Sequence, residues 1–314
     1  MAHLQPGAPS HVDSNTEGAA TSPHVGRDGP ATASLFVMQD VFFRYSRKAP
    51  WVLSGASLSV RRGERVGIIG ENGVGKSTIA KLLLGFFPAD QGVVTLFGKS
   101  VSWQHHFPDL GYIGDPSYVE GEMALPNDLT VGHLLDVYGD LFQASGRSLP
   151  YAESLRTGLG LQESRIRGSK VGNLSKGQRQ RVLVFLALAK SPTLLVADEA
   201  TEGLDGKSRH LILDEIKRVA VERHMAVIWI THRFDEIASL TESVYELREG
   251  KLIRHTGELF HCEVTLNGMV VETGAMPGAA LINHLGRLIL LSSTEEVTVS
   301  AVRTNGATLD EAQH

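Results

Sequence analysis

The residues with the clearest chemistry form a glycine-rich run at positions 70–78, Gly-Glu-Asn-Gly-Val-Gly-Lys-Ser-Thr. The run fits the pattern G-x-x-x-x-G-K-[ST], in which backbone N–H groups cradle the phosphates of a nucleoside triphosphate. In this pattern the ammonium of Lys76 faces the β- and γ-phosphates, and the hydroxyl of Ser77 binds Mg²⁺. The other residues of the run that we expect to contact nucleotide are Asn72, Gly73, Gly75 and Thr78.

The flanking residues supply the elements that such a loop needs. Residues 65–70 indicate a short buried strand, and residues 77–84 carry apolar side chains at helical spacing. Phosphate oxygens are bound by the free N–H groups at a helix N-terminus, so strand, glycine loop and helix must follow in that order. The alternative is an ordinary glycine turn between a strand and a helix, and the correct flanks argue against it.

A second group of candidate residues follows two apolar runs. Residues 193–197 precede Asp198 and Glu199, and their continuous apolarity predicts a parallel strand buried on both faces. Carboxylates at the C-terminal edge of such a strand face the crevice where nucleotides bind. We predict that Asp198 holds Mg²⁺ and that Glu199 accepts the proton of the attacking water. A further apolar run, 225–231, ends beside His232, whose place at the same sheet edge favours a catalytic over a structural histidine.

Two other features have a weaker signal of their own. Ser175 and Gln178 have the spacing of a capping box, which indicates the start of a helix whose N-terminus offers free N–H groups. Tyr45 lies upstream of the glycine-rich run, where its ring could stack on a base. A plain strand aromatic in a small core is an equal alternative for Tyr45.

Length and composition limit the classes of function. With 314 residues, the chain can hold one large domain and a smaller piece, or two modest domains. Its net charge of −5 and the lack of a basic stripe predict no nucleic-acid partner. No apolar run approaches the roughly 20 residues of a membrane span, so we expect any membrane role to depend on a partner. The single cysteine, Cys262, excludes an intrachain disulfide and suits a reducing cytosol.

Composition also predicts how the chain is divided. Residues 1–33 are rich in small and polar residues, which predicts a disordered tail. Short apolar stretches between residues 34 and 60 predict an antiparallel sheet beside the nucleotide core. The stretch from 116 to about 182 predicts a mostly helical insertion, with an amphipathic helix at 129–141.

The C-terminal residues 256–314 predict a small β appendage. Short strands are suggested at 263–268, 280–291 and 296–302. About 60 residues give only a marginal core, so we expect this piece to pack on its own subunit or on a partner subunit.

Together these motifs resemble the ATP-binding subunit of an ABC transporter. The likeness covers residues 34–255 and rests on motifs that stand in the family's order, at 70–78, 174–178 (Leu-Ser-Lys-Gly-Gln), 198–199, 203–205 (Gly-Leu-Asp) and 231–232. The resemblance implies an α/β fold: a P-loop NTPase core of ABC type with an antiparallel β subdomain, a helical insertion and the C-terminal β appendage. It also implies an ATPase that uses ATP and Mg²⁺.

The resemblance implies partners as well. Two such subunits, identical or related, would sandwich two ATP molecules head to tail. Ser175, Gly177 and Gln178 of one subunit would then cap the γ-phosphate bound by the other. His232 would contact the γ-phosphate, and Tyr45 matches the aromatic residue that stacks on adenine. The helical insertion would dock on a separate membrane permease, which would place the protein at the cytoplasmic face of the cell membrane.

The chain departs from the family pattern at four positions. Lys176 replaces the commoner glycine, Ala200 replaces the usual proline, and Glu202 precedes the Gly-Leu-Asp loop. Asp115 stands where a glutamine normally links Mg²⁺ to the permease interface. We predict that Asp115 binds the metal directly, because hard cations favour charged oxygen ligands; the alternative is a loop carboxylate that points into solvent.

The direction of transport has a weaker signal. The helical stretch at 129–141 and the Leu-Ser-Lys-Gly-Gln variant are similar to stand-alone bacterial exporter ATPases, which favours export. An importer ATPase is the alternative, because a β appendage after the ATPase also occurs there. A soluble ABC ATPase without a permease is the alternative from another class.

Overall fold

The computed structural model describes residues 34–102, 107–114, 125–144, 149–255, 259–266, 269–277 and 297–303. Three sequence predictions lie outside these residues: the disorder of residues 1–33, the strand at 280–291 and the role of Asp115. They stay predictions.

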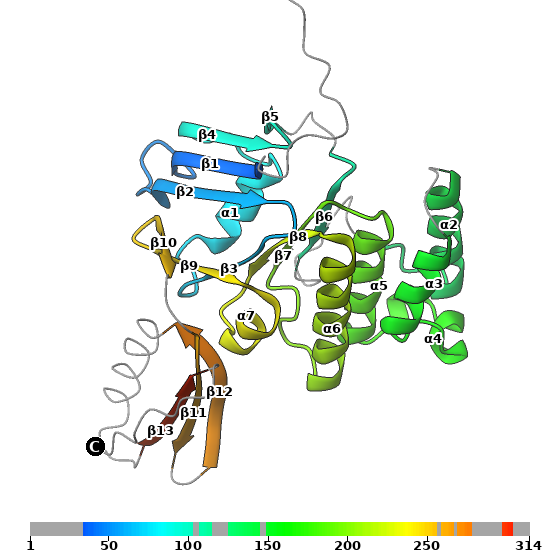
Figure 1. Ribbon diagram of the computed structural model, residues 1–314. Helices are drawn as coiled ribbons and strands as arrows, with labels where there is room; N and C mark the ends of the chain where they lie inside the picture. The colour runs from blue at the N-terminus through cyan, green and yellow to red at the C-terminus, as the bar shows by residue number, and fades with distance from the viewer. Residues whose placement is uncertain are drawn as a thin grey trace, which may run out of the picture. The chain divides into compact units, whose positions relative to one another are not determined.

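The predicted antiparallel sheet is confirmed. Its strands are β1 (Ser34–Phe43), β2 (Leu53–Arg61), β4 (Gln91–Leu96) and β5 (Lys99–Ser100), in the order β2-β1-β4-β5 (Figure 1). β1 pairs with both β2 and β4 in the antiparallel sense. Its buried residues alternate with half-buried or exposed ones along much of the strand, as expected when one face of a sheet is covered.

A six-stranded sheet carries the candidate chemistry. In spatial order its strands are β10 (Lys251–His255), β9 (Ser243–Arg248), β3 (Arg65–Ile69), β8 (Ala226–Ile230), β7 (Leu194–Asp198) and β6 (Leu110–Ile113). All neighbours are parallel except the edge strand β10, which runs antiparallel to β9. Asp198 pairs in register with Ile230, so the ends of β7 and β8 lie at one edge of the sheet. The predicted common edge for Asp198 and His232 is thereby confirmed.

Helices pack beside this sheet (Figure 1). They are α1 (Lys76–Leu83), α2 (Val131–Ala144), α3 (Leu149–Gly158), α4 (Ser164–Gly168), α5 (Lys176–Ala189), α6 (Gly206–Arg223) and α7 (Phe234–Leu240), with a 3₁₀ turn at Val171–Asn173. Helices α2, α3 and α4 lie beyond α5 (Figure 1). The predicted amphipathic helix at 129–141 is present as α2. Asp136 on α2 forms ion pairs with Arg156 on α3 and Arg167 on α4, at 3.5 and 3.1 Å. These pairs tie the three helices together.

The core lies on both faces of the parallel sheet. Strand β8 shows the division: Ile228 and Ile230 pack with the antiparallel sheet and α1, whereas Val227 and Trp229 pack with α5 and α6. All four side chains are fully buried. Because both faces of β8 are covered, the strand is continuously apolar. Polar side chains such as that of His232 can therefore reach the site only from the residues that follow the strand.

The C-terminal strands form a three-stranded antiparallel sheet of their own. It consists of β11 (Leu259–Leu266), β12 (Met269–Pro277) and β13 (Val297–Arg303), in the order β12-β11-β13. Among the described residues of the whole chain, no helix has the length and apolarity needed to span a bilayer.

Candidate active site

The glycine-rich loop connects β3 to α1, in the order predicted from the sequence. Gly75 is the N-cap of α1 and has a φ of 112°, and Gly73 has a φ of 80°. Both angles are in the left-handed range that favours glycine. A Cβ on Gly75 would also lie 2.5 Å from Cγ1 of Val52. The loop therefore needs glycine for backbone shape and for space, and it presents the N-terminus of α1.

Lys76 is buried in this loop, with only 6% of its side chain exposed. Its Nζ donates hydrogen bonds to the carbonyl oxygens of Gly70 (2.9 Å) and Glu71 (3.1 Å). The same Nζ lies 3.7 Å from Oε1 of Glu199, at the end of β7. The structure therefore brings together the lysine of the glycine-rich loop and the predicted general base.

Two oxygen ligands meet beside this lysine. The hydroxyl of Ser77 donates a hydrogen bond of 3.1 Å to Oδ1 of Asp198. Burial raises the pKa of Asp198 to about 6; the charge of Glu199 adds to the rise, while the Ser77 hydrogen bond and the charge of Lys76 oppose it. A carboxylate and a hydroxyl side by side are hard oxygen donors, which is the ligand type that Mg²⁺ prefers. The residues present thus fit a magnesium site.

The buried charge of Asp198 gives a stability prediction. Because the pKa is raised in the folded state, the folded protein binds the proton more tightly, and stability is lost as the pH rises towards 6. The rise of the Asp198 pKa to about 6 sets an upper limit of about 3 kcal/mol on this cost. We expect Asp198→Asn to raise the free energy of unfolding by about 1–2 kcal/mol at pH 7.5, because Asn removes the buried charge. The gain should largely vanish at pH 4. Urea unfolding of both proteins at the two pH values tests this, and a constant difference would contradict it.

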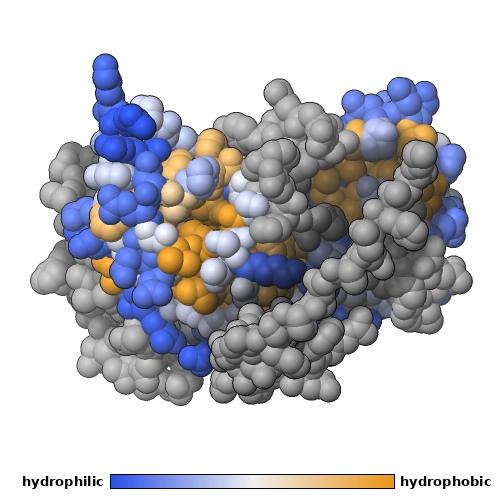
Figure 2. All heavy atoms as spheres, turned by 90° about the horizontal axis from the view of Figure 1, so that it is seen from above, coloured by the Kyte–Doolittle hydropathy of each residue, from blue (hydrophilic) through white to orange (hydrophobic). Residues whose placement is uncertain are grey.

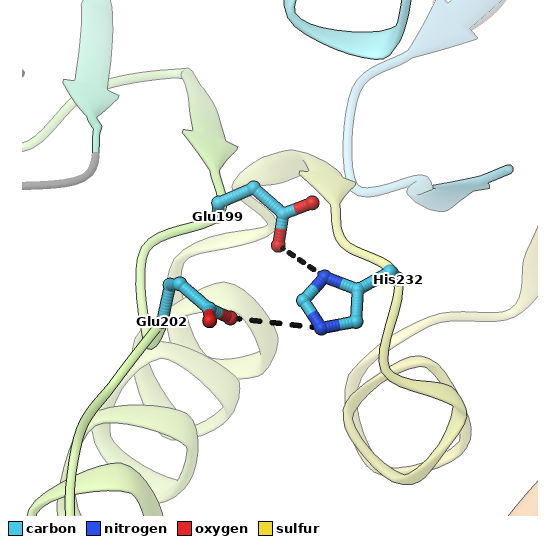
Figure 3. A group of neighbouring side chains, drawn as sticks. All are labelled: Glu199, Glu202 and His232. Carbon is cyan, nitrogen blue, oxygen red and sulfur yellow. Dashed lines mark hydrogen bonds and ion pairs between the residues drawn. The ribbon is translucent and has the colours of Figure 1, made fainter. Parts of the chain in front are cut away.

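The residue after Asp198 has an unusual backbone. Glu199 has a φ of 50°, in the left-handed region that non-glycine residues rarely adopt. Its N–H donates to the carbonyl of Ile230 (2.9 Å), which anchors the turn to the end of β8. Its Oε2 lies 3.0 Å from Nδ1 of His232 (Figure 3). The predicted base and the predicted histidine are therefore in direct contact.

A second carboxylate reaches the other side of the same ring. Oε2 of Glu202 lies 3.6 Å from Nε2 of His232 (Figure 3). One ligand atom from each of Glu199, Glu202 and His232 fits within 4.8 Å, as a metal site requires. However, the ring presents a different nitrogen to each carboxylate, and the ammonium of Lys76 lies beside Glu199. The arrangement is therefore better described as a chain of ion pairs than as a metal centre.

The capping box at Ser175 and Gln178 is confirmed. The backbone N–H of Gln178 donates to Oγ of Ser175 (3.2 Å), and that of Ser175 donates to Oε1 of Gln178 (3.0 Å). Gly177 lies close to the start of α6, because a Cβ there would come within 2.5 Å of Oγ of Ser208. Asp205 caps α6 by accepting a hydrogen bond of 2.9 Å from the N–H of Ser208. The first turns of α5 and α6 are therefore in close contact at Gly177 and Ser208.

Tyr45 follows the end of β1 and is 52% exposed, so it is not a core residue. Its ring packs edge-on against Phe43 and Phe87, with centroids 5.1 and 5.6 Å away. Its hydroxyl lies 2.9 Å from Oγ1 of Thr78, in the first turn of α1. The ring is therefore held next to the phosphate loop by two aromatic contacts and one hydrogen bond.

Sequence reasoning missed Gln180, a fully buried residue of α5. Its Nε2 donates to the carbonyl oxygens of Gly114 (3.1 Å) and Ala200 (2.6 Å). It thus connects the helix that starts at the capping box with the residue before Asp115 and the residue after Glu199. The signal that could have identified it is a polar side chain on the buried face of α5, because a buried polar group needs hydrogen-bond partners.

Strand, glycine loop and helix, with Asp198 and Glu199 at the adjacent strand end, define a P-loop nucleotide-binding protein. Residues 53–202 match the family described as ABC transporter. The chain is 33% identical over 231 residues to the Nod factor export ATP-binding protein I of Rhizobium etli, covering 72% of this chain and 71% of that protein. It is 29% identical over 206 residues to the ribose import ATP-binding protein RbsA of Shouchella clausii, covering 64% and 41%.

Solved structures agree. A bacterial Atm1-family ABC exporter with ATP bound is 29% identical, with a TM-score of 0.57, over 71% of this chain and 39% of that chain. The chain belongs to the ABC transporter family, as an ATP-binding subunit with ATPase activity. The predicted fold class is thereby confirmed. The relatives include both export and import proteins.

Proposed function

We propose that this chain is the ATP-hydrolysing subunit of a transporter in which two such subunits close on two ATP molecules and drive a separate permease in the export direction. The observation that carries the proposal is the convergence of Lys76, Ser77, Asp198, Glu199 and His232 at one edge of the parallel sheet. Each lies at hydrogen-bond or ion-pair distance from another of the group.

In the proposed reaction, the N-terminus of α1 and Lys76 bind the phosphates of ATP. Lys76 would exchange its contact with Glu199 for the β- and γ-phosphates. Ser77 and Asp198 would hold Mg²⁺, which neutralises charge on the phosphates when bound. Asn72, Gly73, Gly75 and Thr78 complete the nucleotide site, and Asp115 is proposed as a further metal ligand.

Glu199 then acts as the general base. Its carboxylate orients a water molecule and accepts one proton as the water oxygen bonds to the γ-phosphorus. The bond from that phosphorus to the bridging oxygen breaks, and ADP leaves with the electron pair. His232 contacts the γ-phosphate and positions Glu199 through Nδ1.

Ser175, Gly177 and Gln178 are proposed to act on the partner subunit's ATP. The capping box fixes the first turn of α5, whose N-terminus is the positive end of the helix dipole. An anion placed there is stabilised by typically 0.3–1 kcal/mol at an exposed site. The capping box is already formed without nucleotide, which supports a phosphate contact at the N-terminus of α5 that does not have to be assembled on binding.

The helices α2–α4 and the residues that precede them are proposed to face the permease. Leu129 and Val137 are exposed large apolar residues there. Figure 2 shows apolar surface among hydrophilic residues on the face seen from above. The similarity to the Nod factor export ATP-binding protein I favours export, and the match to RbsA keeps an importer as the alternative. A soluble ABC ATPase without a permease is the second candidate.

Purification from native membranes tests this proposal. We expect the chain to be released together with a polytopic membrane protein when mild detergent is used. Recovery with soluble partners alone would contradict the permease and favour the second candidate. Accumulation of cargo outside or inside vesicles, measured with ATP on the side that carries this chain, would then separate export from import.

Tyr45 gives a prediction on base stacking. If its ring stacks on adenine, Tyr45→Ala should weaken ATP binding by at least about fivefold, because a stacked base contributes about 1–3 kcal/mol. Tyr45→Phe keeps the ring and loses only the contact with Thr78, so it should bind ATP nearly as the wild type does. Titration with a fluorescent ATP analogue measures both. Equal affinities for the Ala and Phe variants would contradict the stacking role.

A further inference from the structure

Glu202 has no part in the reaction proposed above, yet it contacts His232. Its Oε2 lies 3.6 Å from Nε2 of His232, while Oε2 of Glu199 lies 3.0 Å from Nδ1 (Figure 3). Both ring nitrogens are therefore directed at carboxylates. A neutral imidazole has one N–H and can donate to only one of them, whereas an imidazolium donates to both. Each ring nitrogen of His232 therefore has a carboxylate partner of its own.

The two carboxylates differ in how freely they can leave the ring. The side chain of Glu199 is 19% exposed and also pairs with Lys76, and Glu199 itself has a left-handed backbone conformation. The side chain of Glu202 is 43% exposed and comes from the turn after Glu199. Glu202 can move into water at little cost because its side chain is already partly in solvent, whereas Glu199 is largely enclosed and is needed beside the phosphate to hold the attacking water. Glu202 is the displaceable partner.

A γ-phosphate oxygen that bonds to His232 needs one of these ring nitrogens. An anion cannot take the nitrogen while a carboxylate remains at ion-pair distance, because the two negative groups repel each other. Glu199 must stay near the phosphate to hold the attacking water. The nitrogen that faces Glu202 is thus the one that the γ-phosphate can take.

We propose that Glu202 is a positioning residue that occupies Nε2 of His232 and is displaced by the γ-phosphate of ATP. The inference rests on the proposed function, since it takes His232 as the γ-phosphate contact. ATP must break the Glu202–His232 pair, whereas ADP has no γ-phosphate and leaves the pair in place. Glu202 therefore weakens the binding of ATP but not of ADP.

The test compares two nucleotides on charge-neutral variants. Glu202→Gln keeps the shape of the side chain and removes its charge. By calorimetry with Mg²⁺, we expect its Kd for a non-hydrolysable ATP analogue to fall two- to fivefold, the range expected for an exposed ion pair. Its Kd for ADP should be unchanged. Glu202→Ser, a smaller side chain without a carboxylate, should give the same selective shift. Glu153→Gln, the same change at an exposed site on α3, should alter neither value.

A double-mutant cycle separates positioning from general electrostatics. In a His232→Ala background, Glu202→Gln should no longer change the ratio of the two dissociation constants. The inference is overturned by an unchanged Kd for the ATP analogue, by equal shifts for both nucleotides, or by a selective shift that persists without His232. These outcomes in an otherwise active protein refute only the role of Glu202. A wild-type protein that neither binds nor hydrolyses ATP would instead refute the proposed function.

Discussion

Glu199→Gln is expected to lower the rate of ATP hydrolysis by a factor of about 10²–10⁴, the usual contribution of a positioned general base. The amide keeps the shape of the carboxylate but cannot accept the proton of the attacking water. ATP binding should be retained, because Lys76, Ser77 and Asp198 are unchanged. Loss of the negative charge beside Lys76 should even free its ammonium for the phosphates.

Phosphate release under saturating ATP and Mg²⁺ measures this effect, and a binding titration on the same sample verifies that nucleotide is held. Glu153→Gln is the matched control, since it makes the same chemical change on the surface of α3. Near wild-type turnover in Glu199→Gln would place the base elsewhere.

Lys76→Met is expected to weaken ATP binding by at least tenfold. The variant keeps most of the apolar stem but removes the ammonium that the glycine-rich loop directs at the β- and γ-phosphates. In the structure this ammonium is buried and bonds to the carbonyl oxygens of Gly70 and Glu71. The loop should therefore also become less ordered, because two acceptors lose their donor.

The control is Lys81→Met, which changes an exposed lysine on the same helix. We expect it to bind ATP within about twofold of the wild type, because exposed charges at a distance contribute little in physiological salt. Equilibrium binding of ATP with Mg²⁺ distinguishes the two lysines. Equal effects from both substitutions would mean that only the net charge near the loop matters.

The sequence was sufficient to predict the convergence of Asp198 and His232. Parallel strands end at one edge of a sheet, and continuous apolar runs identify such strands without a structure. The capping box at Ser175 was equally readable, because its three-residue spacing leaves one helical geometry. In both cases a local sequence pattern determines the local structure that places the residues.

The contacts of Glu202 and Gln180 could not be predicted in this way. The position of Glu202 depends on the turn that starts at Glu199. Glu199 has a φ of 50°, and no residue type in this turn predicts that conformation. The bonds of Gln180 depend on how α5 packs over the ends of β6 and β7, which joins residues 20 to 66 positions apart. Side-chain partners across loops follow from tertiary packing, not from local periodicity.

The most direct test of the proposed function is the ATP-dependent assembly of Glu199→Gln. Sedimentation velocity should be measured on this variant with ATP, with ADP and without nucleotide, always with Mg²⁺. If two subunits close on two ATP molecules, the variant should sediment as a dimer with ATP and as a monomer with ADP. A sedimentation coefficient that is the same in all three conditions, while ATP is shown to be bound, would contradict the proposed sandwich.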